Sequence, residues 1–134
     1  MAVLKSFRGL FTTSRCLITF TSYVEWEKLP DKSKQPWAFS LKTDDMFAVA
    51  GLYTDDGFVV IATKPNPLAK NVHERMPAML LPEYEDDWLN PDTEPERLLP
   101  MIQTPYPQEL MKAWRISTLI NKPINNFPEV LKPL

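Results

Sequence analysis

His73 is the only histidine in the 134-residue chain, and it follows an apolar run over residues 58–62 and a connector that holds Pro65 and Pro67. An imidazole gains and loses a proton near neutral pH, so a histidine in a loop after a strand suits acid/base chemistry. The alternative is a structural hydrogen-bonding role. A zinc-binding His-Glu-x-x-His helix is excluded, because position 77 is proline and a second histidine is lacking. We predict neither a metal nor a cofactor.

Glu25 is the second candidate for chemistry, because it is a carboxylate placed among aromatic residues. Strand alternation puts Tyr23, Glu25 and Glu27 on one face and Val24 and Trp26 on the other. A partly buried carboxylate can act as a base or hold an amine. The alternative is a solvated face on which Glu25 only pairs with a lysine. If the chain has chemistry, we expect it where this stretch meets the His73 loop.

The other reactive side chains offer weaker signals. Cys16 stands in an apolar strand directly after Arg15, where a cysteine behaves as a small inert hydrophobe. The three glycines are isolated, so no glycine-rich phosphate loop exists. Arg8, Arg15 and Arg75 are candidate phosphate contacts, with solvated or salt-bridged roles as the alternative. The four tryptophans offer stacking surfaces for bases or, alternatively, core packing.

Composition predicts one domain over residues 1–134, with ordinary hydrophobic and charged content. The net charge of -2 argues against a uniformly basic nucleic-acid binder, but the charge is asymmetric. Residues 1–42 carry seven Lys/Arg and three Asp/Glu, whereas residues 82–97 carry one Arg and seven Asp/Glu. The basic part could therefore still meet phosphate.

The number of cysteines and the hydropathy of the chain indicate in which compartment to expect the protein. The single cysteine allows no intrachain disulfide and fits a reducing, intracellular compartment such as the cytoplasm or nucleoid. No apolar run approaches the length of a membrane span, so we predict no membrane partner.

The elements that position these residues are short, because the chain has 14 prolines and only three glycines. Helical periodicity and helix-start signals predict helices over 2–12, 67–72, 82–89, 94–102 and 107–112. Apolar and β-branched stretches predict strands over 16–21, 23–28, 37–42, 46–53, 58–63, 76–81 and 113–117. The most apolar strand, 58–63, is predicted to be central, after an Asp-Gly hairpin turn. Residues 121–134 are predicted to be a tail along the surface.

Several blocks resemble the SOS response-associated peptidase (SRAP) family in order and spacing over almost the whole chain. They include Arg15-Cys16-Leu17-Ile18, Tyr23-Val24-Glu25-Trp26-Glu27, Val60-Ile61-Ala62-Thr63-Lys64-Pro65-Asn66-Pro67, His73-Glu74-Arg75-Met76-Pro77, Trp88-Leu89-Asn90-Pro91 and Pro105-Tyr106-Pro107.

The resemblance implies an α+β fold with a barrel-like β core and short peripheral helices. It implies binding of single-stranded DNA at an abasic site. In the family an amino-terminal cysteine captures the ring-opened sugar in a covalent crosslink, and self-processing explains the peptidase name. Glu25 falls on the glutamate that orients or deprotonates the amino terminus. His73 falls on the histidine that assists ring opening and proton transfer at the sugar.

The chain also departs from the family pattern. The family's Cys-Gly-Arg start, Trp-Gly element and Asn-Ala-Arg segment lie before the point that corresponds to Met1, so roughly the first third of the domain is absent. Position 2 is Ala2, and Cys16 matches a strand cysteine rather than the nucleophile. The family's Thr-Thr pair is Ala62-Thr63 here, which leaves Thr63 as the one hydroxyl for the sugar or phosphate.

Three hypotheses follow. In the first, the chain is the carboxy-terminal part of an SRAP protein that keeps Glu25 and His73 but cannot crosslink. It would contact DNA through a polar set made of Arg8, Arg15, Thr63 and Arg75. An unpaired β edge would then cause self-association or pairing with a chain that supplies the missing segment. In the second, the chain is a non-catalytic nucleic-acid or protein-binding relic. In the third, it is an unrelated hydrolase that uses Glu25 and His73.

Overall fold

The computed structural model describes residues 2–122 and 128–134. The chain folds into two compact units, and each unit takes separated stretches of sequence. The first is built from residues up to Phe20 with Phe47–Lys64 and Met76–Tyr106. The second is built from Thr21–Met46 and Pro65–Arg75 with the described residues from Pro107 onward. Neither unit corresponds to one continuous half of the sequence.

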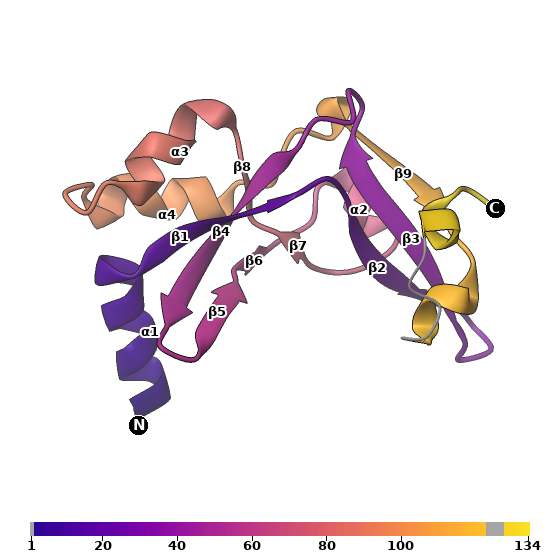
Figure 1. Ribbon diagram of the computed structural model, residues 1–134, viewed down its shortest axis with the longest axis horizontal. Helices are drawn as coiled ribbons and strands as arrows, with labels where there is room; N and C mark the ends of the chain where they lie inside the picture. Colours follow the sequence, from indigo (N-terminus) through magenta and orange to yellow (C-terminus); the bar gives the residue numbers. More distant parts are fainter. Residues whose placement is uncertain (1, 123–127) are drawn as a thin grey trace. The chain divides into compact units, whose positions relative to one another are not determined.

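The first unit holds the longer α-helices and the larger sheet, as Figure 1 shows. Its elements are α1 (Ala2–Thr13), β1 (Arg15–Phe20), β4 (Phe47–Thr54), β5 (Gly57–Val60), β6 (Ala62–Thr63), β7 (Met76–Pro77), β8 (Met79–Leu80), α3 (Pro82–Leu89) and α4 (Pro95–Gln103). Strand β4 is antiparallel to all its partners, with β1 on one side and β5 and β8 on the other.

The core of this unit lies between the sheet and the helices α3 and α4. Trp88 of α3 is fully buried at its centre, where its ring meets Phe11 edge to face at 6.0 Å. The indole Nε1–H donates to the Cys16 carbonyl oxygen at 2.9 Å, so the buried polar end of the ring is satisfied. The other buried members are apolar residues of β4, β8 and α4 and their connections: Ala50, Leu52, Ile61, Ala78, Leu80, Leu98 and Met101.

The prediction that residues 58–63 form the central strand is wrong. The central strand is β4, and the predicted strand divides into β5 and β6 at Ile61. The Ile61 N–H donates to the Ala50 carbonyl oxygen, and the Ile61 carbonyl oxygen accepts from the Ala78 N–H. The first bond continues the β4–β5 register by one residue, and the second joins Ile61 to Ala78, the residue between β7 and β8. Among the described residues β5 pairs only with β4, and its four residues are exposed.

The second unit is organised around a three-stranded antiparallel sheet with the order β2-β3-β9. Its elements are β2 (Tyr23–Lys28), β3 (Lys34–Leu41), α2 (Pro67–Lys70), η1 (Gln108–Leu110), β9 (Met111–Arg115), η2 (Thr118–Asn121) and η3 (Pro128–Leu131). Strands β2 and β3 form a hairpin in which Glu25 lies opposite Trp37. The short helix predicted over 107–112 is the 3-10 helix η1, which is shorter than predicted because β9 already begins at Met111.

The α+β class is confirmed, with antiparallel pairing and short helices throughout the described residues. Their sheets stay open, and none closes into a barrel. The predicted tail lies outside the description over 123–127. Where the tail is described, the Leu134 N–H donates to the Arg115 carbonyl oxygen at 3.0 Å, which ties the end of the chain to β9. No helix in the described part of the chain is long and apolar enough to cross a membrane.

Candidate functional site

Strand β2 positions Glu25 at the edge of the second unit's sheet. The Tyr23 ring stacks on Phe39 with centroids 4.7 Å apart, and the Trp37 indole N–H donates to Glu27 at 2.9 Å. These two cross-strand contacts stand on either side of Glu25 and hold its register. Glu25 Oε1 accepts the Trp26 backbone N–H at 3.1 Å, which leaves Oε2 for the pocket.

The loop after α2 positions His73 in the same unit. The buried side chain of Asn66 caps α2 by accepting the Ala69 N–H at 2.9 Å, and Pro67 suits the first helical position. The Asn66 amide also contacts Met111 Sδ on β9 at 3.4 Å. At the other end, the His73 N–H donates to the Ala69 carbonyl oxygen at 3.0 Å. The loop therefore has a defined path although α2 is short.

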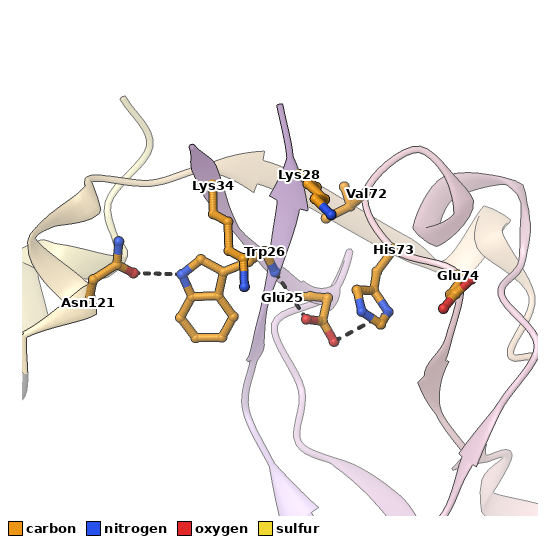
Figure 2. A pocket seen from close by; sticks show the side chains of 8 residues that line it. All are labelled: Glu25, Trp26, Lys28, Lys34, Val72, His73, Glu74 and Asn121. Atoms are coloured by element: carbon orange, nitrogen blue, oxygen red, sulfur yellow. Dashed lines mark hydrogen bonds and ion pairs between the residues drawn. The ribbon is translucent and has the colours of Figure 1, made fainter. Parts of the chain in front are cut away.

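The structure brings Glu25 and His73 together. Glu25 Oε2 lies 3.9 Å from His73 Nδ1, and the two side chains are 29% and 39% exposed. Figure 2 shows the two side chains pointing at each other, one from β2 and one from the loop after α2. At this distance a protonated imidazole forms an ion pair with the carboxylate, but at the protein surface such a pair contributes only about 1 kcal/mol or less to stability. The pair therefore contributes little to the stability of the fold.

The backbone of Arg75 contacts one ring nitrogen of His73 through both of its polar groups. The Arg75 N–H donates to His73 Nδ1 at 3.1 Å in the tautomer that leaves Nδ1 unprotonated. When Nδ1 takes up a proton, it faces two acceptors, the Arg75 carbonyl oxygen at 3.3 Å and Glu25 Oε2. The ring can hold a proton at Nδ1 without leaving its place.

Tyr23 lies on the same strand as Glu25, two residues before it. Burial, and then the charge of Glu25, raise the pKa of the Tyr23 hydroxyl. It therefore stays a neutral hydrogen-bond donor over the whole physiological pH range. The carboxylates that line the pocket with His73 are those of Glu25 and Glu74.

Glu25 and His73 line one surface pocket of about 620 Å³, a volume that fits a small ligand or a sugar with its phosphate. All its lining residues belong to the second unit: Glu25, Trp26, Lys28, Lys34, Val72, His73, Glu74 and Asn121. Within the described residues, no group of three or more His, Cys, Asp or Glu side chains is placed to hold a metal ion.

Of the DNA-contact candidates, only Arg75 lies in the same unit as the pair, two residues after His73. Its side chain is exposed. Arg8 and Thr63 belong to the first unit. Arg8 is exposed on α1, whereas Thr63 is only 5% exposed in β6, opposite Met76.

Arg15 proves to be structural, which corrects its place among the DNA contacts. Its Nε donates to the Trp88 carbonyl oxygen at 2.6 Å, and Nη2 donates to the Asn90 carbonyl oxygen at 2.7 Å. Nη1 donates to the carbonyl oxygens of Phe11 and Thr12 at 2.6 and 3.1 Å. Every nitrogen of the guanidinium is thus used at the carboxyl ends of α1 and α3, where carbonyl groups lack helical partners and favour a cation. Burial lowers the pKa of Arg15 from its high ordinary value.

Cys16 lies in β1 of the first unit and is half-buried. Burial raises the pKa of its thiol, so the reactive thiolate is scarcer near neutral pH than in a free cysteine. This environment matches the inert strand residue expected from the sequence.

Sequence reasoning missed four pocket residues: Trp26 as a pocket wall, Lys28, Lys34 and Asn121. The Trp26 indole N–H donates to the Asn121 side-chain oxygen at 2.6 Å, across 95 positions of sequence. No local pattern could have revealed that pair. The two lysines did carry a signal, because they flank the polar turn of the hairpin.

Known proteins resemble this chain in sequence and in fold. The family profile described as "SOS response associated peptidase (SRAP)" matches residues 1–123. Two Bacillus subtilis proteins, the abasic site processing proteins YoqW and YoaM, are 41% and 37% identical to the chain over 95% and 94% of its length. The chain spans 61% and 60% of the length of these relatives.

Two crystal structures share the fold. A protein from Bacteroides thetaiotaomicron is 30% identical, with a TM-score of 0.87 over 96% of this chain and 60% of that one. A protein from Bordetella bronchiseptica is 20% identical, with a TM-score of 0.69 over 83% of this chain and 59% of that one, and shows the fold alone. Together with the profile match, the relatives establish that this chain belongs to the SOS response associated peptidase family.

Proposed function

We propose that the chain binds single-stranded DNA at an abasic site and that Glu25 and His73 act on the exposed sugar. The observation that carries this is the Glu25 Oε2 to His73 Nδ1 distance of 3.9 Å inside one pocket. The names of the relatives, abasic site processing proteins, supply the class of substrate. The role fits a DNA-associated protein in a reducing compartment, where the lone Cys16 stays a thiol.

The chemistry suited to this pair is opening of the sugar ring. In the closed sugar, C1 carries a hydroxyl group and is bonded to the ring oxygen. Opening removes the hydroxyl proton, forms the C1 carbonyl, breaks the bond to the ring oxygen and protonates that oxygen. His73 takes the first proton and returns it to the ring oxygen. Glu25 stabilises the imidazolium that exists between the two transfers, because its carboxylate faces Nδ1.

The DNA backbone contacts in this proposal are the exposed arginines Arg75 and Arg8. A guanidinium binds phosphate through paired N–H donors. Arg15 is left out because its donors already bind four backbone carbonyl oxygens.

Two measurements on the 134-residue chain test the proposal. Binding of fluorescent single-stranded oligonucleotides should be tighter with one abasic site than without, by about 10-fold or more if one hydrogen bond to a charged group is gained at the sugar. We also expect no crosslink that survives a denaturing gel, because Ala2 has no thiol and the thiol of Cys16 is half-buried in β1. Equal affinity for the two oligonucleotides would contradict the binding proposal, and a stable crosslink would contradict the second expectation.

The edge strand β5 leads to a prediction about assembly. Phe58, Val59 and Val60 are 59%, 56% and 39% exposed, and residues Gly57–Val60 carry no charge. An apolar strand with a free edge pairs readily with another strand, and an uncharged strand can pair antiparallel with its own copy without opposing like charges. We propose that two copies of the chain associate through β5.

Light scattering of the purified chain should therefore give a mass above that of the 15.5 kDa monomer. Val59→Lys should restore the monomer, because a charge on an edge strand blocks pairing. Leu99→Lys, which changes an exposed apolar residue of α4 in the same unit, is the matched control and should leave association intact. A monomeric wild-type chain at micromolar concentration would refute pairing through β5.

A further inference from the structure

Two lysines face each other across the β2–β3 hairpin of the second unit. Lys28 and Lys34 are register partners at the end of the hairpin, and both are exposed. Like charges directly opposite in an antiparallel pair destabilise the sheet. A cross-strand pair that breaks this local rule calls for a compensating partner, and such exceptions concentrate at functional sites.

The carboxylates around the hairpin do not supply that partner. Asp31, in the turn, accepts both the backbone N–H and the hydroxyl of Ser33, and these bonds lower the pKa of its carboxyl group. Glu27 accepts the Trp37 indole N–H. In the part of the chain that the structure describes, no carboxylate lies within 4.0 Å of the Lys28 or Lys34 ammonium group.

Both lysines line the pocket that holds Glu25 and His73. Figure 2 shows Lys34 beside the Trp26 side chain and Lys28 beside Val72. Trp26 cannot swing freely, because its indole N–H is bonded to Asn121 at 2.6 Å. The pocket thus combines the Glu25–His73 pair with two lysine side chains and an aromatic ring held in place.

We propose that Lys28 and Lys34 together bind one backbone phosphate of the DNA strand whose abasic sugar lies at His73. Two ammonium groups offer up to six N–H donors and two charges, which matches the acceptor oxygens and charge of a phosphodiester. The bound phosphate removes the repulsion between the lysines and sets the position of the strand in the pocket. This inference rests on the proposed function, and it assigns a phosphate subsite that the arginines do not provide.

The test is the salt dependence of single-stranded DNA binding by the full chain. Each phosphate that the protein neutralises contributes about 0.7 to the slope of log K against log salt for single strands. Because the two lysines share one phosphate, the double variant Lys28→Gln/Lys34→Gln should lower the magnitude of the slope by about 0.7 and weaken binding of abasic and intact oligonucleotides alike. Lys28→Arg/Lys34→Arg should keep the wild-type slope.

The matched control is Lys42→Gln/Lys132→Gln, which removes the same charge from exposed lysines of the same unit that do not line the pocket. An equal loss of slope in the control would overturn the proposal, as would an unchanged slope in the Lys28/Lys34 variant. If the wild-type chain binds neither oligonucleotide, the proposed function fails together with this inference. If it binds and only the slope prediction fails, the proposed function stands.

A second readout is independent of DNA. Removal of the opposed charges should leave the urea midpoint of Lys28→Gln/Lys34→Gln equal to or above that of the wild-type chain, because repulsion in the free hairpin is relieved. A lower midpoint would indicate that the lysines stabilise the fold, and it would overturn their assignment as a ligand site.

Discussion

Arg15→Ala is expected to lower the free energy of unfolding by about 3–5 kcal/mol, the cost of removing a buried charged partner and leaving polar groups unsatisfied. Arg15 is 9% exposed, and its guanidinium binds four backbone carbonyl oxygens near the ends of α1 and α3. It also lies 5.6 Å from the centre of the Trp88 ring. One side chain thus joins two helices to the core, and alanine keeps none of these contacts.

Urea denaturation followed by circular dichroism measures the loss. Arg15→Lys should recover only part of it, because a single ammonium group cannot reach carbonyl oxygens of both helices at once. Arg8→Ala is the control: Arg8 is an exposed arginine of the same helix α1, and its removal should change stability by about 0.5 kcal/mol or less. If Arg15→Ala were as mild as Arg8→Ala, Arg15 would not be the structural link described above.

Local chemistry made several elements predictable from the sequence. The helix over 82–89 was predicted with the bounds that α3 has, because Pro82 and two acids in the first turn are strong start signals. Strand β2 was also predicted with its observed bounds, and its alternation placed Glu25 beside aromatic residues. The hairpin before β5 followed from the Asp-Gly pair, and Gly57 has the positive φ of 139° that such a turn requires.

What the sequence could not supply depends on partners far along the chain. Apolar character alone suggested that residues 58–63 were central, but an exposed edge strand with Phe58 and Val59 has the same composition as a buried one. Arg15 looked like a phosphate contact because its carbonyl partners at Trp88 and Asn90 are more than 70 positions away. Burial and hydrogen-bond satisfaction are decided by the folded chain.

The candidate site was likewise only partly predictable from the sequence. The family blocks singled out Glu25 and His73, and the structure places both in one pocket, while their catalytic role stays a prediction. The DNA-contact candidates Arg8, Arg15 and Thr63 belong to the other unit. The Lys28/Lys34 pair is visible only when the register of the hairpin is known.

His73→Ala and, to a smaller extent, Glu25→Gln are expected to weaken the proposed action of the chain on the abasic sugar. Ring opening can be followed with an excess of an aminooxy reagent, which traps the aldehyde as an oxime as soon as it forms. The wild-type chain should accelerate trapping on a bound abasic oligonucleotide. His73→Ala should lose about 10²-fold or more of that acceleration, the usual contribution of a positioned general acid or base.

Glu25→Gln removes the charge of the side chain but keeps its shape. The glutamine oxygen can still accept the Trp26 N–H, so the side chain keeps its place, but the charge that faces His73 Nδ1 is lost. We expect a loss of acceleration smaller than that of His73→Ala, because the carboxylate stabilises the imidazolium rather than transferring the proton itself. The change should appear in the trapping rate, with little effect on the affinity for intact single-stranded DNA.

Glu27→Gln is the matched control, because Glu27 lies two residues away on the same face of β2, binds Trp37 and does not line the pocket. With Glu27→Gln, the reagent should trap the aldehyde at the rate seen with the wild-type chain. A non-catalytic relic predicts a different result: both pocket variants would bind abasic DNA as the wild-type chain does, and no chain would accelerate trapping. A wild-type chain that accelerates trapping while His73→Ala does so equally well would place the chemistry outside the Glu25–His73 pocket. Because Glu25 and Glu27 carry the same charge on the same strand, any difference between their variants is attributable to the position of Glu25 facing His73.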